Sequence, residues 1–235
     1  MAEFVLGVIT ARGGSRGIKN KAIADLGGLP LIAYTIKSAA ASRMLDDFIV
    51  STDSRKIARA AESFGAKVPF MRPKELALDE TLTLPVLKHA VRQYEKIFKK
   101  KAGIVVLLQP TSPFRKAKHI DEAVKLIASS KADSVFSVAP LEVSPKWLFK
   151  IENCELKFAF GKDFSKIRRQ DTGGYYRLHG LIRVYRRSTL MKAKKYAVGR
   201  KILPLVTSKQ DSIEIDSPED LQIAEALLRA KKPKH

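Results

Sequence analysis

The sequence has only one cysteine, Cys154, and no long run of apolar residues. A lone cysteine cannot close an internal disulfide, and without a neighbouring cysteine it cannot build a zinc site, so we expect a small, partly buried residue. The apolar run nearest the N-terminus, residues 4–9, is too short to span a membrane and lacks the basic flank of a signal peptide. These absences predict a soluble, cytoplasmic protein that does not associate with membranes.

Acidic residues are also scarce, because 24 Asp and Glu residues face 44 Lys and Arg residues and leave a formal net charge of +20. The excess is concentrated in residues 166–201, where twelve basic residues are opposed by one acid, Asp171. Such a surface attracts polyanions, so weak and salt-sensitive binding of nucleic acid is expected. The chain contains no recognised nucleic-acid-binding module, which argues against a specific reader of DNA or RNA.

What the chain does contain is a basic, glycine-rich loop directly after its first apolar run. Gly13, Gly14 and Gly17 are interspersed with cations that include Arg12 and Lys21. Because glycine permits positive φ and close backbone approach, successive N–H groups can point at one anion while the cations neutralise its charge. The loop is therefore predicted to bind phosphate groups. The loop lacks the GKS or GKT ending of a P-loop, which argues against an ATPase. It also lacks the G-x-G-x-x-G fingerprint of dinucleotide-binding proteins, which argues against a dehydrogenase.

Short apolar runs alternate with amphipathic segments along most of the chain. Strands are predicted at residues 4–10, 48–52, 104–108, 134–138, 178–185 and 203–206. Helices are predicted between them, and this alternation is typical of a mainly parallel sheet covered by helices. The pattern breaks at residues 139–177, where prolines and glycines punctuate short segments. We therefore predict one domain, residues 1–235, with an insertion at this point.

Two carboxylates near the end of the sequence form a candidate metal site. Apolar and acidic residues alternate there, so Glu214 and Asp216 should project to one side of an extended strand. Ser217 and Asp220 then form a predicted capping box, with Pro218 at the first helical position. Paired carboxylates at the end of a strand suit Mg²⁺, which takes oxygen ligands from carboxylates and phosphates. A solvent-facing acidic edge is the alternative.

Two other segments offer groups that could bind a sugar and a carboxylate. Gln109, Thr111 and Ser112 follow a predicted buried strand, in a stretch that two prolines stiffen. An amide beside hydroxyls suits a polyol, although a plain loop would use the same residues. Arg168 and Arg169 lie in the insertion, and the planar fork of arginine can bind a carboxylate in two places.

Several blocks of sequence, taken in order, resemble one family. They are ARGGSRGIKNK at residues 11–21, GGLPLIAYTI at 27–36, IVSTDS at 49–54, RPKELA at 72–77, LLQPTSPFR at 107–115, RRQD at 168–171 and QDSIEID at 210–216. The sequence is similar over nearly its whole length to the CMP-sialic acid synthetases, also called N-acylneuraminate cytidylyltransferases. The resemblance implies a Rossmann-like α/β nucleotidyltransferase fold, a three-layer sandwich with a mainly parallel sheet and a small dimerisation insertion.

The resemblance also implies an activity, a cofactor and a partner. CMP would pass from CTP to the anomeric hydroxyl of a nine-carbon 2-keto sugar acid, N-acetylneuraminate or a relative, with Mg²⁺ as cofactor and release of pyrophosphate. In this family the insertion contacts a second subunit and lends residues to the neighbouring active site. A homodimer is therefore implied for this chain, with Lys146 as a residue that reaches the partner's site.

Roles for individual residues follow from the same resemblance. The nucleotide-binding residues would be Ala11, Arg12, Gly13, Ser15, Lys21, Arg72, Thr81 and Thr83. The substrate-binding residues would be Gln109, Thr111, Ser112, Lys146, Arg169 and Arg177, and the metal ligands would be Asp216 and Glu214. Arg12, Lys21 and Arg169 would be catalytic, because phosphoryl transfer needs alignment and charge neutralisation rather than an activated Ser or Cys.

The sequence departs from the family at three places. Ala22 and Glu214 stand where the family usually has Asn and Asp, and His179-Gly180 stands where an Asn-Gly pair is common. Two alternatives therefore stay open. One is a cytidylyltransferase for 3-deoxy-manno-octulosonate, pseudaminic or legionaminic acid. The other is a non-catalytic, basic protein on the same fold that binds nucleotides or nucleic acid.

Overall fold

The computed structural model describes residues 3–15, 17–141, 143, 145, 148–159, 174–194 and 199–231. The strands of its main sheet are β1 (Val5–Thr10), β4 (Asp47–Ser51), β5 (Ile104–Leu108), β6 (Ser134–Pro140), β9 (Tyr176–Arg186) and β10 (Ile202–Val206). The helices are α1 (Leu31–Ala40), α2 (Arg55–Ser63), α3 (Thr83–Phe98), α4 (Ala117–Ala128), α5 (Arg187–Lys192) and α6 (Pro218–Lys231), with the short 3₁₀ helices η1 (Lys21–Ile23) and η2 (Lys74–Leu76). Two small hairpins are formed by β2 (Asp25–Leu26) with β3 (Leu29–Pro30) and by β7 (Phe149–Glu152) with β8 (Glu155–Phe158).

The main sheet has six strands in the order β10-β6-β9-β5-β1-β4. β1 runs parallel to β4 and β5, β10 runs parallel to β6, and β9 is antiparallel to both of its neighbours. All residues of β5 are buried, as expected for an apolar strand that is covered on both faces. The prediction of a mainly parallel sheet is confirmed.

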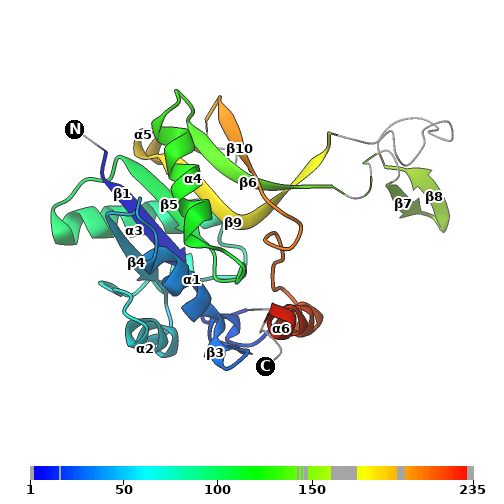
Figure 1. Ribbon diagram of the computed structural model, residues 1–235, viewed down its shortest axis with the longest axis horizontal. Coiled ribbons are helices and arrows are strands. Elements are labelled where there is room, and N and C mark those ends of the chain that lie inside the picture. The colour runs from blue at the N-terminus through cyan, green and yellow to red at the C-terminus, as the bar shows by residue number, and fades with distance from the viewer. Residues whose placement is uncertain are drawn as a thin grey trace.

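Helices cover both faces of this sheet and give the fold three layers (Figure 1). Successive residues of a strand point to opposite faces. Val5 and Ile9 of β1 therefore pack with α1, α2 and α4, whereas Leu6 and Val8 pack with α3 and α5. The predicted three-layer α/β sandwich is confirmed. In the described part of the chain, no helix combines the length and apolar character that crossing a membrane requires.

β6 and β9 lead away from the body of the molecule toward a projecting hairpin (Figure 1). Their ladder reaches Pro140 opposite Tyr176, and β7 and β8 form the hairpin beyond it. Cys154 lies exposed at the hairpin turn with φ 64°, so the expectation of a partly buried cysteine is wrong. In the predicted insertion, the described residues continue β6 to Pro140, begin β9 at Tyr176 and form the β7–β8 hairpin, with no βα unit among them.

The segment that carries Glu214 and Asp216 is not a strand of the sheet. Residues 213–216 have no regular secondary structure, although the Ile215 N–H donates to Thr111 O at 2.8 Å. The sequence alternates at this point because Ile215 is fully buried in a small core cluster while Asp216 is exposed. The prediction of an extended strand is therefore wrong. Apolar and acidic residues alternate here because Ile215 packs into the core from an irregular segment.

The start of α6 does follow the predicted capping box. Ser217 Oγ accepts a hydrogen bond from the Asp220 N–H at 3.2 Å, and Asp220 Oδ2 accepts one from the Ser217 N–H at 2.8 Å. The helix packs beside β2, and Ala224 shares its buried cluster with Leu26 and Ile215. These contacts fix Asp216 between a helix start and the core.

Candidate functional site

The carboxyl ends of β1 and β5 border a cavity of about 390 Å³. Its lining residues are Thr10, Ala11, Arg12, Ser15, Gly17, Lys21, Ala22, Leu31, Pro110, Thr111 and Asp216. Ligands of open α/β sheets bind at this edge, where loops follow the ends of parallel strands. The cavity brings together six residues of the predicted site, namely Ala11, Arg12, Ser15, Lys21, Thr111 and Asp216.

Asp53 fixes the start of the glycine-rich loop. Its Oδ1 accepts a hydrogen bond from the Gly13 N–H at 2.9 Å, and the Ala11 N–H donates to Ser51 O at 3.1 Å. β1 and β4 are adjacent and parallel, so the residues that follow them meet at one edge of the sheet. No motif in the sequence assigns this role to Asp53. Its position just after β4 is the signal that could have indicated it.

Gly17 brings the far end of the loop against the acidic segment. A Cβ atom at this position would lie 2.1 Å from Asp216 O, so no other residue fits without moving one of the two backbones. Glycine is required here because the backbones of Gly17 and Asp216 approach each other closely. The contact sets the distance between Gly17 and Asp216.

Lys21 spans the gap between the loop and the acidic segment. Its Nζ lies 2.7 Å from Asp216 Oδ1 and donates to Ile215 O at 3.1 Å. The Lys21 side chain is 15% exposed, whereas that of Asp216 is 74% exposed. Asn20 precedes it in the left-handed conformation and directs the chain into η1, where Ala22 is buried. The cation is therefore held firmly, while its carboxylate partner faces solvent.

Arg12 is held on the opposite side of the loop by the segment between η2 and α3. Its guanidinium forms an ion pair with Asp79 at 2.7 Å and donates to Leu78 O at 3.1 Å. Both side chains are substantially exposed, and exposed pairs of this kind contribute little stability. A bound anion can therefore replace Asp79 as the partner of Arg12.

Arg72, Thr81 and Thr83 lie outside the cavity lining. Arg72 is buried, and its guanidinium donates to Ser51 O and Ser51 Oγ at the end of β4. Burial lowers its pKa to about 10, and the negative charge of Asp53 opposes this shift. Thr81 donates its hydroxyl to Glu75 O at 3.3 Å, and Thr83 begins α3. Their roles as nucleotide contacts stay predictions.

Gln109 and Glu214 meet above the backbone of Gly180. Glu214 Oε1 accepts a hydrogen bond from the Gly180 N–H at 2.9 Å. A Cβ at Gly180 would lie 2.4 Å from both Gln109 Oε1 and Glu214 Oε1, so glycine is needed to admit the two side chains. Burial raises the pKa of Glu214, and the neighbouring charge of Asp216 adds to the shift, although the hydrogen bond from Gly180 opposes it.

Arg115 lies buried beside this cluster and ties the end of β5 to the middle of β9 and to α1. Its guanidinium donates to Gln109 O at 2.7 Å, to Thr35 Oγ1 at 2.8 Å, to Gly180 O at 3.4 Å and to Leu181 O. Burial lowers its pKa to about 9, while the charge of Glu214 opposes the change. No sequence signal marks this arginine as buried, since arginine is mostly exposed in proteins.

The remaining predicted residues are spread around the site. Thr111 lines the cavity, whereas Ser112 is fully buried and its Oγ has no hydrogen-bond partner among the described residues. Arg177 donates to Ser212 Oγ at 2.8 Å, outside the cavity lining. Lys146 and Arg169 lie outside the described residues.

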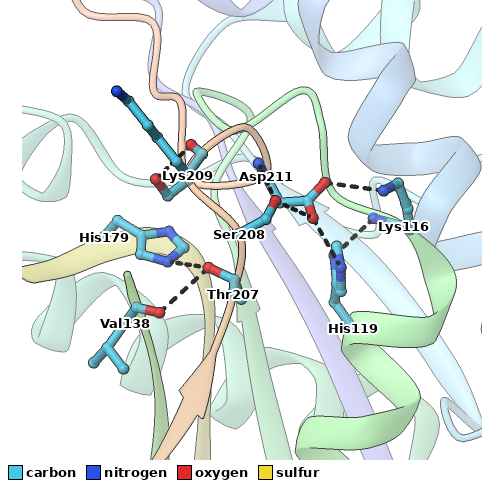
Figure 2. A network of polar contacts seen from close by, with 9 residues as sticks. Lys116, His119, Val138, His179, Thr207, Ser208, Lys209 and Asp211 are labelled. Carbon is cyan, nitrogen blue, oxygen red and sulfur yellow. Dashed lines mark hydrogen bonds and ion pairs between the residues drawn. The ribbon is translucent and has the colours of Figure 1, made fainter. Parts of the chain in front are cut away.

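A network of polar contacts anchors the turn that precedes the acidic segment (Figure 2). Asp211 accepts hydrogen bonds from Lys116 Nζ at 3.0 Å and from the Ser208 hydroxyl at 2.7 Å. His119 Nε2 lies 3.6 Å from Asp211 Oδ2, while His119 Nδ1 accepts from the Lys116 N–H. The turn is thus tied to the start of α4, and this fixes where the acidic segment begins.

His179 makes a second anchor for the same turn (Figure 2). Its Nε2 lies 2.9 Å from Thr207 Oγ1, whose hydroxyl donates to Val138 O at 3.3 Å. Burial lowers the pKa of His179 to about 4, with the nearby charge of Arg177 acting in the same direction. His179 is therefore neutral at pH 7, and its role is to hold the turn through its contact with Thr207.

A mainly parallel sheet whose carboxyl edge carries a basic glycine-rich loop opposite a carboxylate has the architecture of an α/β nucleotidyltransferase. A family described as cytidylyltransferase matches residues 6–226 of the chain. The chain therefore belongs to the cytidylyltransferase family.

Comparison with individual relatives is more specific than the family match. An N-acylneuraminate cytidylyltransferase of Escherichia coli O18:K1:H7 is 34% identical over 98% of this chain and 54% of its own length, so this chain spans about half of that relative. A CMP-N,N'-diacetyllegionaminic acid synthase of Legionella pneumophila is 35% identical over 95% of this chain and 96% of its own length. A synthase of the same name from Campylobacter jejuni is 32% identical over 98% and 97% of the two chains. The predicted resemblance to N-acylneuraminate cytidylyltransferases is confirmed.

Solved structures share the fold at lower sequence identity. CMP:2-keto-3-deoxy-manno-octonic acid synthetase complexed with CTP superposes with a TM-score of 0.72 at 18% identity, covering 97% of this chain and 99% of that one. 4-Diphosphocytidyl-2C-methyl-D-erythritol synthase from Anaerococcus prevotii gives a TM-score of 0.66 at 14% identity with the same coverage. At sequence identities this low, the structural similarity is evidence for a shared fold alone.

Proposed function

We propose that the protein transfers CMP from CTP to the anomeric hydroxyl of a nine-carbon 2-keto sugar acid and releases pyrophosphate. The observation that carries the proposal is the cavity that Arg12, Lys21 and the carboxylate of Asp216 all line, with Lys21 paired to Asp216. Membership of the cytidylyltransferase family supports CTP as the nucleotide. The names of the bacterial relatives support an acidic nine-carbon sugar as the acceptor.

In this reaction the oxygen of the anomeric hydroxyl attacks the α-phosphorus of CTP and releases its proton to solvent, while the bond from that phosphorus to the bridging oxygen of pyrophosphate breaks. Catalysis of such a step depends mainly on alignment and on cations that stabilise the leaving group. Lys21 and Arg12 fit this requirement because both line the cavity and carry positive charge that can bind phosphate oxygens. The backbone N–H groups of the loop add donors for the same phosphates.

Mg²⁺ fits the donor set of this site. Asp216 presents an exposed carboxylate, and the described residues contain no group of three or more His, Cys, Asp or Glu side chains that could enclose a metal ion. One or two carboxylates completed by substrate phosphates and water are what Mg²⁺ prefers, so Asp216 would hold the ion, with Glu214 nearby. When bound, Mg²⁺ supplies Lewis-acid stabilisation of phosphoryl charge.

Asp216→Asn should raise the Mg²⁺ concentration needed for half-maximal pyrophosphate release by at least about tenfold, because the amide loses the charge that attracts the ion. The matched control is Glu219→Gln, which removes an exposed carboxylate from the first turn of α6 without changing the cavity. A titration of rate against Mg²⁺ measures the effect. Equal half-saturation in the Asp216→Asn variant and the wild type would contradict the proposed ligand.

The acceptor would bind near Gln109 and Thr111, in the loop that follows β5. Thr111 lines the cavity, and Gln109 is oriented by the shared contact with Gly180. Arg169 and Lys146 of the insertion are proposed to bind the sugar carboxylate, since arginine and lysine suit an anionic acceptor. In this proposal the acceptor would bind beside the loop after β5, and the triphosphate would bind beside the glycine-rich loop.

We also propose that the β7–β8 hairpin makes a homodimer. In its register Phe149 faces Phe158 and Ile151 faces Leu156, so four apolar side chains share one face. Ile151 and Leu156 are 76% and 71% exposed in the single chain. An isolated two-stranded hairpin is marginal in water, and an exposed apolar face of this kind is typical of an interaction surface.

Ile151→Glu combined with Leu156→Glu should convert a dimer to a monomer in sedimentation velocity, because two charges would enter an apolar interface. Ile223→Glu on α6 is the matched control, since it adds a charge at another exposed apolar position. A wild-type protein that sediments as a monomer at working concentration, or a hairpin variant that stays dimeric, would overturn the dimer proposal.

The activity itself is tested by pyrophosphate release with Mg²⁺ and CTP. The panel of acceptors comprises N-acetylneuraminate, N,N'-diacetyllegionaminate, pseudaminate and 3-deoxy-manno-octulosonate, with UTP and no-sugar controls. The proposal requires release that depends on both CTP and a nine-carbon acid. Release with only the eight-carbon acid would identify the related enzyme class, and CTP binding without release from any acceptor would favour a non-catalytic nucleotide-binding protein.

A further inference from the structure

A second cavity, of about 550 Å³, lies between η2, the first turns of α3 and the end of α5. It shares no lining residue with the cavity of the proposed active site. Its volume is within the range of small-molecule sites, which is about 300–1,000 Å³. Leu76, Leu82 and Leu84 form an apolar wall, and Leu82 is 66% exposed.

Cations surround the apolar wall. Lys88, Arg92 and Lys194 line the cavity, and its described lining contains no acidic residue. Lys88 and Arg92 are four residues apart on one face of α3, where like charges repel each other. Lys88 Nζ donates to Ala193 O, which holds this cation at the junction of α3 and α5. An anion in the cavity would relieve the repulsion between the positive charges.

The cavity also shares a segment with the proposed active site. Leu76, Leu82 and Leu84 flank the stretch that holds Arg12, since Arg12 binds Leu78 O and Asp79. A molecule seated against the three leucines would therefore press on the segment that positions a nucleotide-binding cation. Two sites that bias the position of one segment are coupled, and the coupling is reciprocal.

We propose that this second cavity binds an amphipathic organic anion, a molecule with an apolar body and one carboxylate, sulfonate or phosphate group, and that its occupancy changes the affinity for CTP. The apolar body contacts the leucine wall, and the acidic group lies among Lys88, Arg92 and Lys194. This site goes beyond the proposed function, because it concerns a ligand that takes no part in the transfer reaction.

The probe for the test is 8-anilinonaphthalene-1-sulfonate, whose fluorescence rises in an apolar environment. Titration of the intact protein should show one saturable site per chain. Arg92→Glu and Lys194→Glu should each raise the dissociation constant of the probe by about tenfold, because each variant reverses one charge of the cavity. Lys96→Glu is the matched control, since Lys96 is an exposed lysine one turn further along α3 and outside the cavity.

The same titration distinguishes the second cavity from the nucleotide site. Added CTP should shift the dissociation constant of the probe by a limiting factor of several-fold that does not grow further with CTP, as coupling between separate sites requires. Complete displacement by CTP would place the probe in the nucleotide site and overturn the proposal. No saturable binding, or equal affinity in Arg92→Glu and the wild type, would overturn it as well.

An unchanged probe affinity at saturating CTP would disprove the coupling. Far-UV circular dichroism of each variant verifies the fold, since all three substitutions lie at exposed positions. Because the probe titration needs no turnover, its result is independent of whether the chain transfers CMP.

Discussion

Lys21→Ala should lower kcat/KM for CTP-dependent pyrophosphate release at least about a thousandfold, as removal of a preorganised cation from a phosphoryl-transfer site does. The Lys21 side chain is mostly buried and is positioned by Ile215 O and Asp216 Oδ1, so its charge needs little reorganisation during the reaction. Solvent would replace it poorly, because the Lys21 side chain is only 15% exposed. A steady-state assay over a range of CTP concentrations measures the loss.

Lys19→Ala is the matched control for this variant. Lys19 belongs to the same loop and carries the same charge, but it is exposed and does not line the cavity. We expect its kcat/KM to fall by less than about tenfold, since an exposed charge acts through screened, long-range attraction. If both variants lost activity equally, the loop would act through its total charge, and the particular position of Lys21 would not matter.

Regular elements of this protein were predictable from the sequence, because burial on both faces leaves a clear pattern. The run at residues 104–108 contains no polar residue, and it forms β5 with the same bounds. The capping box at Ser217 and Asp220 is a local motif that requires no tertiary information, and it is present as predicted. The glycine-rich loop was predictable for the same reason, since its cations and glycines are contiguous.

Long-range features of the site were not predictable in the same way. The segment around Ile215 alternates like a strand, but its neighbour in space is the loop at Thr111, which no local pattern indicates. Asp53 holds Gly13 across two parallel strands, and this contact follows only once the strand order is known. A buried arginine such as Arg115 is contrary to the usual exposure of its residue type, so the sequence gives no sign of it.

Arg115→Met should lower the free energy of unfolding by about 3–5 kcal/mol, because it removes the charge that a buried cluster depends on. Methionine fills a similar volume but donates no hydrogen bond. Gln109 O, Gly180 O and Thr35 Oγ1 would lose their donor, and the half-buried carboxylate of Glu214 would lose a nearby positive charge. A lower midpoint of urea unfolding at unchanged m-value would report this loss.

Arg186→Met is the control that shows whether the loss of stability in Arg115→Met comes from burial of the arginine or from the number of its hydrogen bonds. Arg186 also donates to carbonyl groups, Ala132 O at 2.9 Å and Ser130 O at 2.7 Å, but it is partly exposed and pairs with Glu3 at the surface. Water can replace those bonds, so the expected loss is about 1–2 kcal/mol. The Arg115 variant should in addition raise KM for the sugar acid, because Arg115 holds the backbone of Gln109, whereas Arg186→Met should leave KM unchanged. Equal losses of stability with unchanged KM in both variants would mean that Arg115 supports the sheet alone and does not position the acceptor site.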